Sequence, residues 1–169
     1  QGLQNLRAAL RFCQQQEWSV RTAPDMWFLP HTMDREFLQE EGIYRQLPQW
    51  LEWMPLVTSA QMITALPEGR LRAEWGLGVE VQQAQQIGLS PHAPARLVQQ
   101  GRVLEVYGSW QVTENSQSDA QMYRTCMERA AALNLIPEPM VFRTLFCYTE
   151  KAGVRQMHCM LRVAVKAAW

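Results

Sequence analysis

The stretch that decides the fold is Gly101-Arg102-Val103-Leu104-Glu105-Val106-Tyr107-Gly108-Ser109-Trp110. A run of β-branched and aromatic residues between glycines is typical of a β-strand. Alternation places Leu104 and Val106 on one face of this strand, and Glu105 and Tyr107 on the other. The aliphatic face is suited to packing on a helix, and the face with the carboxylate and the phenol is suited to binding. We therefore expect this strand to line a pocket for a small, largely apolar ligand.

Composition and charge limit the classes of function. The 169-residue chain is 47% hydrophobic, which fits one globular domain or two small halves around a shared core. Sixteen basic and sixteen acidic residues cancel, whereas binding to a phosphate backbone needs clustered Lys and Arg. We expect no direct DNA binding by this chain. The sequence shows no signal peptide and no apolar run of about eighteen residues, so we expect a cytoplasmic protein without a membrane partner.

The cysteines and histidines argue against metal and thiol chemistry. Four cysteines and three histidines are scattered, and no C-x-x-C motif occurs. A metal site would need ligands from distant segments, so we expect neither a metal nor another cofactor. Buried, reduced thiols are the simpler interpretation. Because no Ser-His-Asp or Cys-His arrangement is visible, the sequence assigns no catalytic residue, and we expect a protein that is not an enzyme.

The rest of the chain alternates between strand patterns and helix patterns. Strands are predicted at 18–22, 26–29, 61–66, 72–81, 102–111, 141–148 and 156–165. Helices are predicted at 33–41, from Tyr44 or Leu47 to Met54, and at 119–132. Residues 82–100 are expected to be a polar connector. Gly76 and Gly78, inside a predicted strand, indicate a bulge or the close approach of another backbone or a ligand.

The order strand, helix, strand, strand occurs twice. The last strands of the two units are alike, Leu77-Gly78-Val79-Glu80-Val81 and Leu161-Arg162-Val163-Ala164-Val165. Such repetition predicts an α+β fold in which two pseudo-symmetric βαββ units, at about 18–81 and 102–166, form mainly antiparallel sheets. We expect a central ligand cleft at the seam between the two units.

The chain begins with an amphipathic pattern. Leu3, Leu6, Leu10 and Cys13 have the three-four-three spacing of a heptad stripe. The pattern predicts either a first helix that lies on the domain or the end of a longer dimerising helix. The residues alone leave both interpretations open.

The Leu-Gly-Val-Glu-Val strand, the Gly-Arg-Val-Leu-Glu-Val-Tyr strand and the Pro-Met-Val-Phe run at 139–142 resemble the GyrI-like effector-binding domain. The resemblance covers about residues 18–166. This domain occurs alone or behind the DNA-binding regions of AraC-type and MerR-type regulators. In multidrug-sensing MerR-type activators, a coiled-coil helix joins it to a winged helix-turn-helix. The resemblance implies a dimerisation helix ending within 1–16, an effector-binding domain at 17–169, and a homodimeric activator whose DNA-binding part lies outside this chain.

The function implied by the resemblance is ligand sensing. We expect the domain of a bacterial transcription regulator that binds bulky aromatic or lipophilic compounds, cations among them, and relays occupancy to a DNA-binding module. One alternative is a GyrI-like hydrolase of reactive small molecules, with Glu105 and either Tyr107 or Tyr123 as acid and base. Another alternative is a stand-alone inhibitor that acts through protein contacts.

The resemblance also implies pocket residues. The aromatic residues expected to line the pocket are Tyr44, Trp75, Tyr107, Trp110 and Phe142. Family members that bind lipophilic cations carry a glutamate on the strand that matches residues 139–148. In this chain that strand holds Arg143 instead, which we include among the ligand-binding residues.

Glu105 is the most informative single residue of the predicted site. A carboxylate within an apolar strand costs several kcal/mol to bury unpaired. Three environments are open to it. It either pairs with an arginine across the sheet (Arg102, Arg143 or Arg162), faces water at an edge, or serves as the counter-charge of a ligand.

Overall fold

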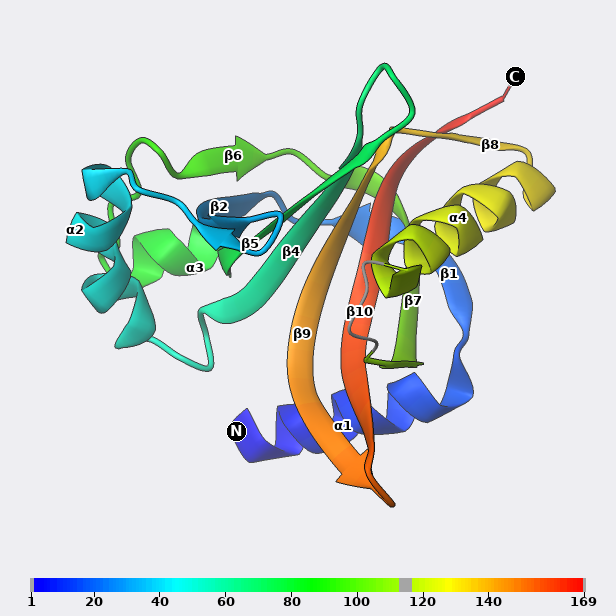
Figure 1. Ribbon diagram of the computed structural model, residues 1–169, viewed down its shortest axis with the longest axis horizontal. Helices are drawn as coiled ribbons and strands as arrows, with labels where there is room; N and C mark the ends of the chain where they lie inside the picture. The colour runs from blue at the N-terminus through cyan, green and yellow to red at the C-terminus, as the bar shows by residue number, and fades with distance from the viewer. Residues whose placement is uncertain (1, 113–116, 169) are drawn as a thin grey trace.

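The structure, a computed structural model, describes residues 2–112 and 117–168 and has an α+β fold (Figure 1). Within these residues the helices are α1 (Gly2–Gln15), α2 (Glu41–Leu51), α3 (Val81–Gln86) and α4 (Gln117–Ala132). The first five strands are β1 (Trp18–Ala23), β2 (Met26–Met33), β3 (Glu36–Phe37), β4 (Thr58–Ala65) and β5 (Leu71–Glu80). The others are β6 (Arg96–Val98), β7 (Gly101–Gln111), β8 (Leu135–Pro137), β9 (Met140–Lys151) and β10 (Val154–Ala167).

These strands form one antiparallel sheet, ten-stranded within the described residues, with the main order β1-β7-β10-β9-β4-β5-β2-β3. Strands β4 and β9 pair at its centre, so the sheet contains a strand-helix-strand-strand unit on each side of this pairing. The α+β class and the mainly antiparallel sheet predicted from the sequence are confirmed. The residue limits of the two repeats remain a prediction. No helix among the described residues has both the length and the apolar character that crossing a lipid bilayer requires.

Two long segments, residues 18–33 (β1 and β2) and residues 96–111 (β6 and β7), pair with each other and join the two halves of the sheet. β1 pairs with β7 up to Ala23 opposite Gly101, and β2 pairs with β6 from Met26 opposite Val98 in the same register. At the crossing, the Asp25 carboxylate accepts a hydrogen bond of 3.0 Å from the backbone N–H of Gln100. β2 also pairs with β5, and the path through β4, β9 and β10 returns to β7. Strand pairing therefore joins the two halves twice, between residues 18–33 and 96–111 and between β4 and β9.

Helices from both halves cover the same face of the sheet (Figure 1). Helices α2 and α3 pack on β2 and β5 around Leu29, Trp50 and Leu77. Helix α4 packs on the other half around Val106 and Cys126. The alternation along paired strands places Leu77 and Val106 on this helical face. The aliphatic face predicted for the β7 stretch is therefore covered by a helix.

Helix α1 lies on the opposite face of the sheet, across β7, β9 and β10. Cys13 is 1% exposed, and its thiol donates to the carbonyl of Cys159 at 3.7 Å. The ring of Phe12 lies 5.4 Å from that of Tyr107. The observed arrangement is thus a first helix that lies on the domain. Its pairing with a second copy remains a prediction.

The structure corrects two segments. Residues 33–40 are not helical, because Asp34 and Arg35 turn the chain with φ values of 48° and 75° and lead into β3, and helix begins only at Glu41. Residues 82–100 contain most of α3 and all of β6.

Strand β2 continues past Pro30, which lies at a register shift, where a missing N–H is tolerated. A Cβ at Gly76 would overlap the carbonyl oxygen of Leu29, so the close backbone approach predicted there is confirmed.

Candidate functional site

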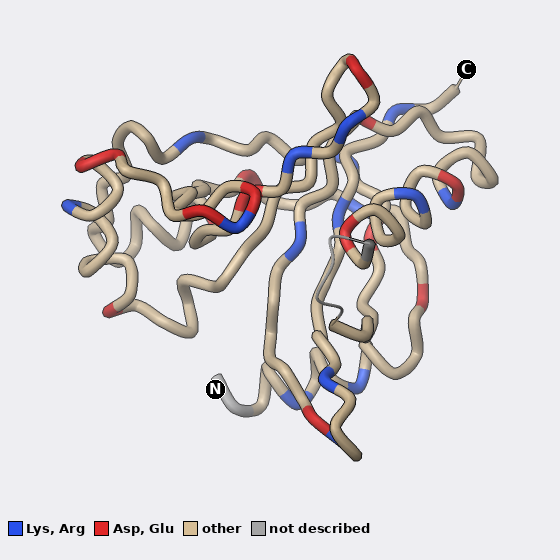
Figure 2. Tube along the Cα trace, viewed as in Figure 1, with Lys and Arg blue, Asp and Glu red and all other residues tan. Residues whose placement is uncertain are grey.

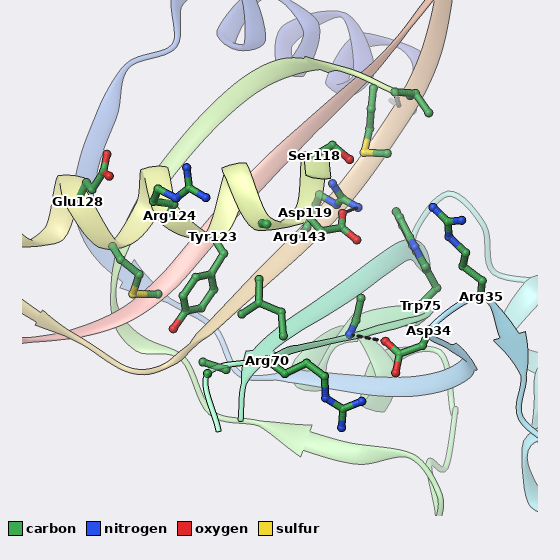
Figure 3. A pocket seen from close by; sticks show the side chains of 18 of the residues that line it. Asp34, Arg35, Arg70, Trp75, Ser118, Asp119, Tyr123, Arg124, Glu128 and Arg143 are labelled. Carbon is green, nitrogen blue, oxygen red and sulfur yellow. Dashed lines mark hydrogen bonds and ion pairs between the residues drawn. The ribbon is translucent and has the colours of Figure 1, made fainter. Parts of the chain in front are cut away.

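A cavity of about 1060 Å³ lies on the helical face of the sheet, where the two halves meet. Helix α4 forms one wall, and the β4–β5 hairpin with the turn at Asp34 and Arg35 forms the facing wall (Figure 3). Tyr148 of β9 and Met157 of β10 complete the lining. The cavity occupies the seam at which the sequence places a cleft.

A buried arginine forms the floor of this cavity. Arg143 is 1% exposed, and its guanidinium carbon lies 4.7 Å from the centre of the Trp75 ring. Its Nη2 donates to Asp119 Oδ1 at 3.3 Å, and its Nη1 lies 3.0 Å from the sulfur of Met122. The Nε–H has no partner among the described residues. Burial lowers the pKa of Arg143, and the nearby Asp119 acts in the opposite direction, so the guanidinium stays charged at neutral pH.

Asp119 is held from two sides. Besides Arg143, the amide nitrogen of Gln61 donates to its Oδ2 at 3.1 Å. Gln61 is fully buried, and its Oε1 has no partner among the described residues. Asp119 lies in the first turn of α4, where a carboxylate also interacts favourably with the helix dipole. The floor thus combines one satisfied ion pair with two unpaired polar atoms, Arg143 Nε and Gln61 Oε1.

The mouth of the cavity carries exposed charges. Arg35 and Arg70 lie on the hairpin side, and Arg124 and Glu128 lie on α4. The Asp34 carboxylate accepts a hydrogen bond of 3.3 Å from the backbone N–H of Ala73 (Figure 3). Figure 2 shows arginines on the β4–β5 hairpin, on α4 and on β9. A ligand in the cavity therefore meets charges of both signs.

Apolar side chains form the remaining wall. Tyr123 projects from α4 towards the β4–β5 hairpin (Figure 3), and Met127 of α4 and Leu71 of β5 also line the cavity. Burial raises the pKa of Tyr123, so its phenol stays protonated at neutral pH and offers both a hydrogen bond and a flat ring. Together with Trp75, these side chains can enclose an aromatic or aliphatic body.

Glu105 lies on the other face of the sheet. It is 3% exposed and accepts a hydrogen bond of 2.7 Å from Nε of Arg162. Arg21 Nη1 lies 3.4 Å from its other oxygen. Of the three environments open from the sequence, the pair with Arg162 across the sheet is observed. A ligand contact of Glu105 remains a prediction, and its carboxylate is already bound by two arginines.

Tyr107 and Trp110 also lie outside the cavity lining. The Tyr107 ring is stacked at 5.8 Å on Phe146 beneath α1. Burial raises the pKa of Tyr107, and Glu105 adds to this effect. The Trp110 ring covers Gly108, where a Cβ would overlap it, and packs against the core under α4.

Tyr44 and Phe142 have structural surroundings as well. Tyr44 is 44% exposed on α2, and its hydroxyl donates to the carbonyl of Leu38 at 2.7 Å. Phe142 is 2% exposed and packs edge-on against Phe28 at 5.9 Å. Of the seven ligand-binding residues expected from the sequence, Trp75 and Arg143 line the cavity. A role in binding for the other five remains a prediction.

Sequence reasoning missed much of the lining. Asp119, Tyr123 and Met127 recur every four residues on α4, and that spacing could have placed them on one face. Arg70 lies in a turn of the other half, and no sequence pattern links it to α4. The pairing of β4 with β9 brings these segments together.

A second cavity, of about 510 Å³, lies near the crossing of the long segments. Its lining includes Gln100, which is 6% exposed and has neither amide atom paired among the described residues. Arg102 and Lys166 also line it. This cavity is half the size of the first, and it provides matched control positions for tests of the first.

The thiols in the core are unsuited to nucleophilic catalysis. Burial raises the pKa of Cys126 and of Cys159 to about 12. The reactive thiolate is therefore scarce at neutral pH. Among the described residues, no three His, Cys, Asp or Glu side chains gather closely enough to hold a metal ion. The arrangement is suited to enclosing a ligand by stacking and ion pairing.

No family model and no curated protein matches the sequence. The chain is similar to a hydrolase from Listeria innocua, with a TM-score of 0.47, 15% identity, and coverage of 89% of this chain and 92% of that chain. It is similar to an uncharacterized conserved protein from Listeria innocua, with a TM-score of 0.49, 11% identity and coverage of 89% and 93%. A proposed transcription regulation protein from Staphylococcus aureus gives a TM-score of 0.43, 8% identity and coverage of 90% and 99%. At these scores and identities, no activity passes from those proteins to this chain.

Proposed function

We propose that this chain is the ligand-sensing domain of a bacterial transcription regulator and that it binds a bulky compound with aromatic or lipophilic parts. The observation that carries the proposal is the cavity of about 1060 Å³ at the seam of the two halves. Ligand pockets of drug-sized compounds occupy about 300–1,000 Å³ and combine apolar walls with a few fixed polar groups. Trp75 and Tyr123 provide such walls, and Arg143 provides such a group.

The relay would run through β9 and β10. On the helical face, Arg143 of β9 and Met157 of β10 line the cavity. On the other face, Phe146 of β9 stacks on Tyr107 beneath α1, and Cys13 of α1 donates to the backbone of β10. A ligand that binds one arrangement of this hairpin more tightly shifts α1 as well. A DNA-binding module joined to α1 would respond to that shift.

Binding is tested by calorimetric titration with aromatic dyes of neutral, cationic and anionic charge. The variant Ala120→Trp places a large side chain in the cavity from α4, and we expect it to weaken binding more than tenfold. Its matched control is Ala131→Trp on the exposed side of the same helix, which should bind as the wild type does. If no dye binds at high micromolar concentration, or if the two variants bind equally, the proposal is wrong.

The relay has its own readout, the rate of alkylation of Cys13. Cys13 is 1% exposed on the side of α1 that faces the sheet, whereas Cys147 is partly exposed. In a Cys147→Ser background, ligand should change the alkylation rate of Cys13, measured by mass spectrometry of its peptide. An unchanged rate at saturating ligand would separate binding from relay and would leave the sensor without an output through α1.

The hydrolase alternative is tested in the same samples. Its expected acid, Glu105, is bound by two arginines on the face away from the cavity. We therefore expect each bound dye to be recovered unchanged after long incubation, as measured by chromatography. If the wild type converts a dye and Ala120→Trp does not, the function of this cavity is catalysis and not sensing.

A further inference from the structure

We infer that the ligand of the large cavity is a bulky hydrophobic anion, such as an aromatic carboxylic acid, and not a lipophilic cation. This inference rests on the proposed function and specifies the charge of the ligand. Among the described residues, the lining contains four arginines and three carboxylates, which leaves one positive charge in excess. The arginines are Arg35, Arg70, Arg124 and Arg143, and the carboxylates are Asp34, Asp119 and Glu128.

Two of the three carboxylates are already bound by donors of the protein. Asp119 accepts from Arg143 at 3.3 Å and from Gln61 at 3.1 Å. Asp34 accepts from the backbone N–H of Ala73 at 3.3 Å. Neither Asp34 nor Glu128 makes an ion pair with a described residue, and both are exposed at the mouth. A cation would therefore find carboxylates without an ion pair only where water screens charge most strongly.

Arg70 pairs with Glu68 at 3.5 Å, but two of the other arginines, Arg143 and Arg124, keep donors that no described residue binds. Arg143 is buried at the floor, and its Nε–H has no partner among the described residues. Arg124 forms no ion pair within the part of the chain that the structure describes. The charge of Arg143 is paired with Asp119, but an anion beside it could also accept from the buried Nε–H, which a cation could not do.

The amino-terminal end of α4 adds to the positive charge of the cavity. Ser118, Asp119 and Ala120 of its first turns line the cavity. The amino-terminal end of a helix of this length carries a partial positive charge. Trp75, Tyr123 and Met127 surround these groups with apolar surface. The combination fits a ligand whose hydrophobic body contacts the rings while its anionic group points towards the arginines.

Two ions of nearly equal size and opposite charge test the inference: tetraphenylborate and tetraphenylphosphonium. Each is titrated into the protein by calorimetry in sodium buffer. We expect tetraphenylborate to bind at least tenfold more tightly, with the difference shrinking as salt is raised. Arg124→Gln should weaken binding of the anion about fivefold and should not weaken binding of the cation. Arg102→Gln, an exposed arginine of the second cavity, should leave both affinities unchanged.

Each contrary result has a distinct meaning. Tighter binding of tetraphenylphosphonium overturns the inference and leaves the sensor proposal standing. Equal weakening by Arg124→Gln and Arg102→Gln also overturns it, because it shows a general charge effect. If neither ion binds, the inference is wrong, and the sensor proposal is then decided separately by the dye titrations with Ala120→Trp.

Discussion

Two buried ion-pair sites, around Glu105 and around Arg143, lie on opposite faces of the same sheet. They differ in how many of their polar atoms have partners within the protein. On the α1 face, Glu105 is 3% exposed and has two arginine partners, at 2.7 and 3.4 Å. On the α4 face, Arg143 is 1% exposed, has one carboxylate partner at 3.3 Å, and borders a large cavity. The first site is closed by protein alone. The second leaves a donor, Arg143 Nε, without a partner among the described residues and beside a cavity.

The difference shows how a structural charged side chain in the core can be told from one that binds a ligand. Burial of a charge is costly, so each such residue must have a counterpart. When the protein supplies every counterpart, as it does for Glu105, the residue is structural. When a buried donor next to a cavity has no partner among the described residues, as for Arg143 Nε, a ligand can supply one. The sequence drew attention to both residues, but only the geometry separates their roles.

The largest expected effect comes from opening the closed site. Glu105→Gln leaves Arg162 buried without a carboxylate, and we expect the free energy of unfolding to fall by about 3 kcal/mol in urea denaturation. Arg21→Gln is the control, because Arg21 is half exposed and exposed ion pairs contribute less than about 1 kcal/mol. Dye affinity per folded molecule should stay unchanged in both variants. A loss of affinity in Glu105→Gln would place Glu105 in the binding site.

A smaller effect is expected at the open site. In Asp119→Asn, the side-chain oxygen can still accept from Arg143, and the adjoining cavity can admit water, so the expected destabilisation is about 1–2 kcal/mol. Tetraphenylborate should bind several-fold more tightly because Arg143 is less well neutralised. Glu128→Gln removes the same charge from the mouth and should change stability by less than about 0.5 kcal/mol. If Asp119→Asn destabilises as strongly as Glu105→Gln, the two sites do not differ in the way described.

The smallest expected effect is a pH dependence of stability that comes from His31. It must be known before stabilities of the two sites are compared at different pH values. Burial lowers the pKa of His31, so the unfolded chain takes up the proton first. The free energy of unfolding should therefore fall as pH drops below about 6.5, by less than about 1 kcal/mol by pH 5. His31→Asn should flatten this part of the curve, measured by urea denaturation at several pH values. His92→Asn, at an exposed position, should leave the slope as it is.

The sequence predicted the strands well because their patterns are long. The β7, β9 and β10 segments alternate over eight residues or more, and each was placed close to its observed limits. The segment at 33–41 failed because its charged residues resemble a helix start. In the structure, Asp34 and Arg35 adopt positive φ values, and no common sequence signal marks that turn. Strand β6 is only three residues long, too short for a periodic pattern to show.

The site was less predictable than the fold. Trp75 and Arg143 were expected in the pocket, and both line the cavity. Tyr107 was expected beside them because it lies on the polar face of its strand. Which face of the sheet is hollow depends on where α1 and α4 pack, and that follows from contacts between distant segments. The charges at the mouth depend in addition on how the β4–β5 hairpin approaches α4.

The crossing at Asp25 and Gln100 has a consequence for biosynthesis. Strand β1 finds its partner, β7, only when residues 101–106 have left the ribosome, and the β6 side of β2 stays open until residues 96–98 follow, so the first half emerges with uncovered strand edges. Pairing between such distant segments is slow, and uncovered edges favour aggregation. Fragments that end before residue 96 should therefore collect in inclusion bodies, and the complete chain should become protease-resistant in a single late step.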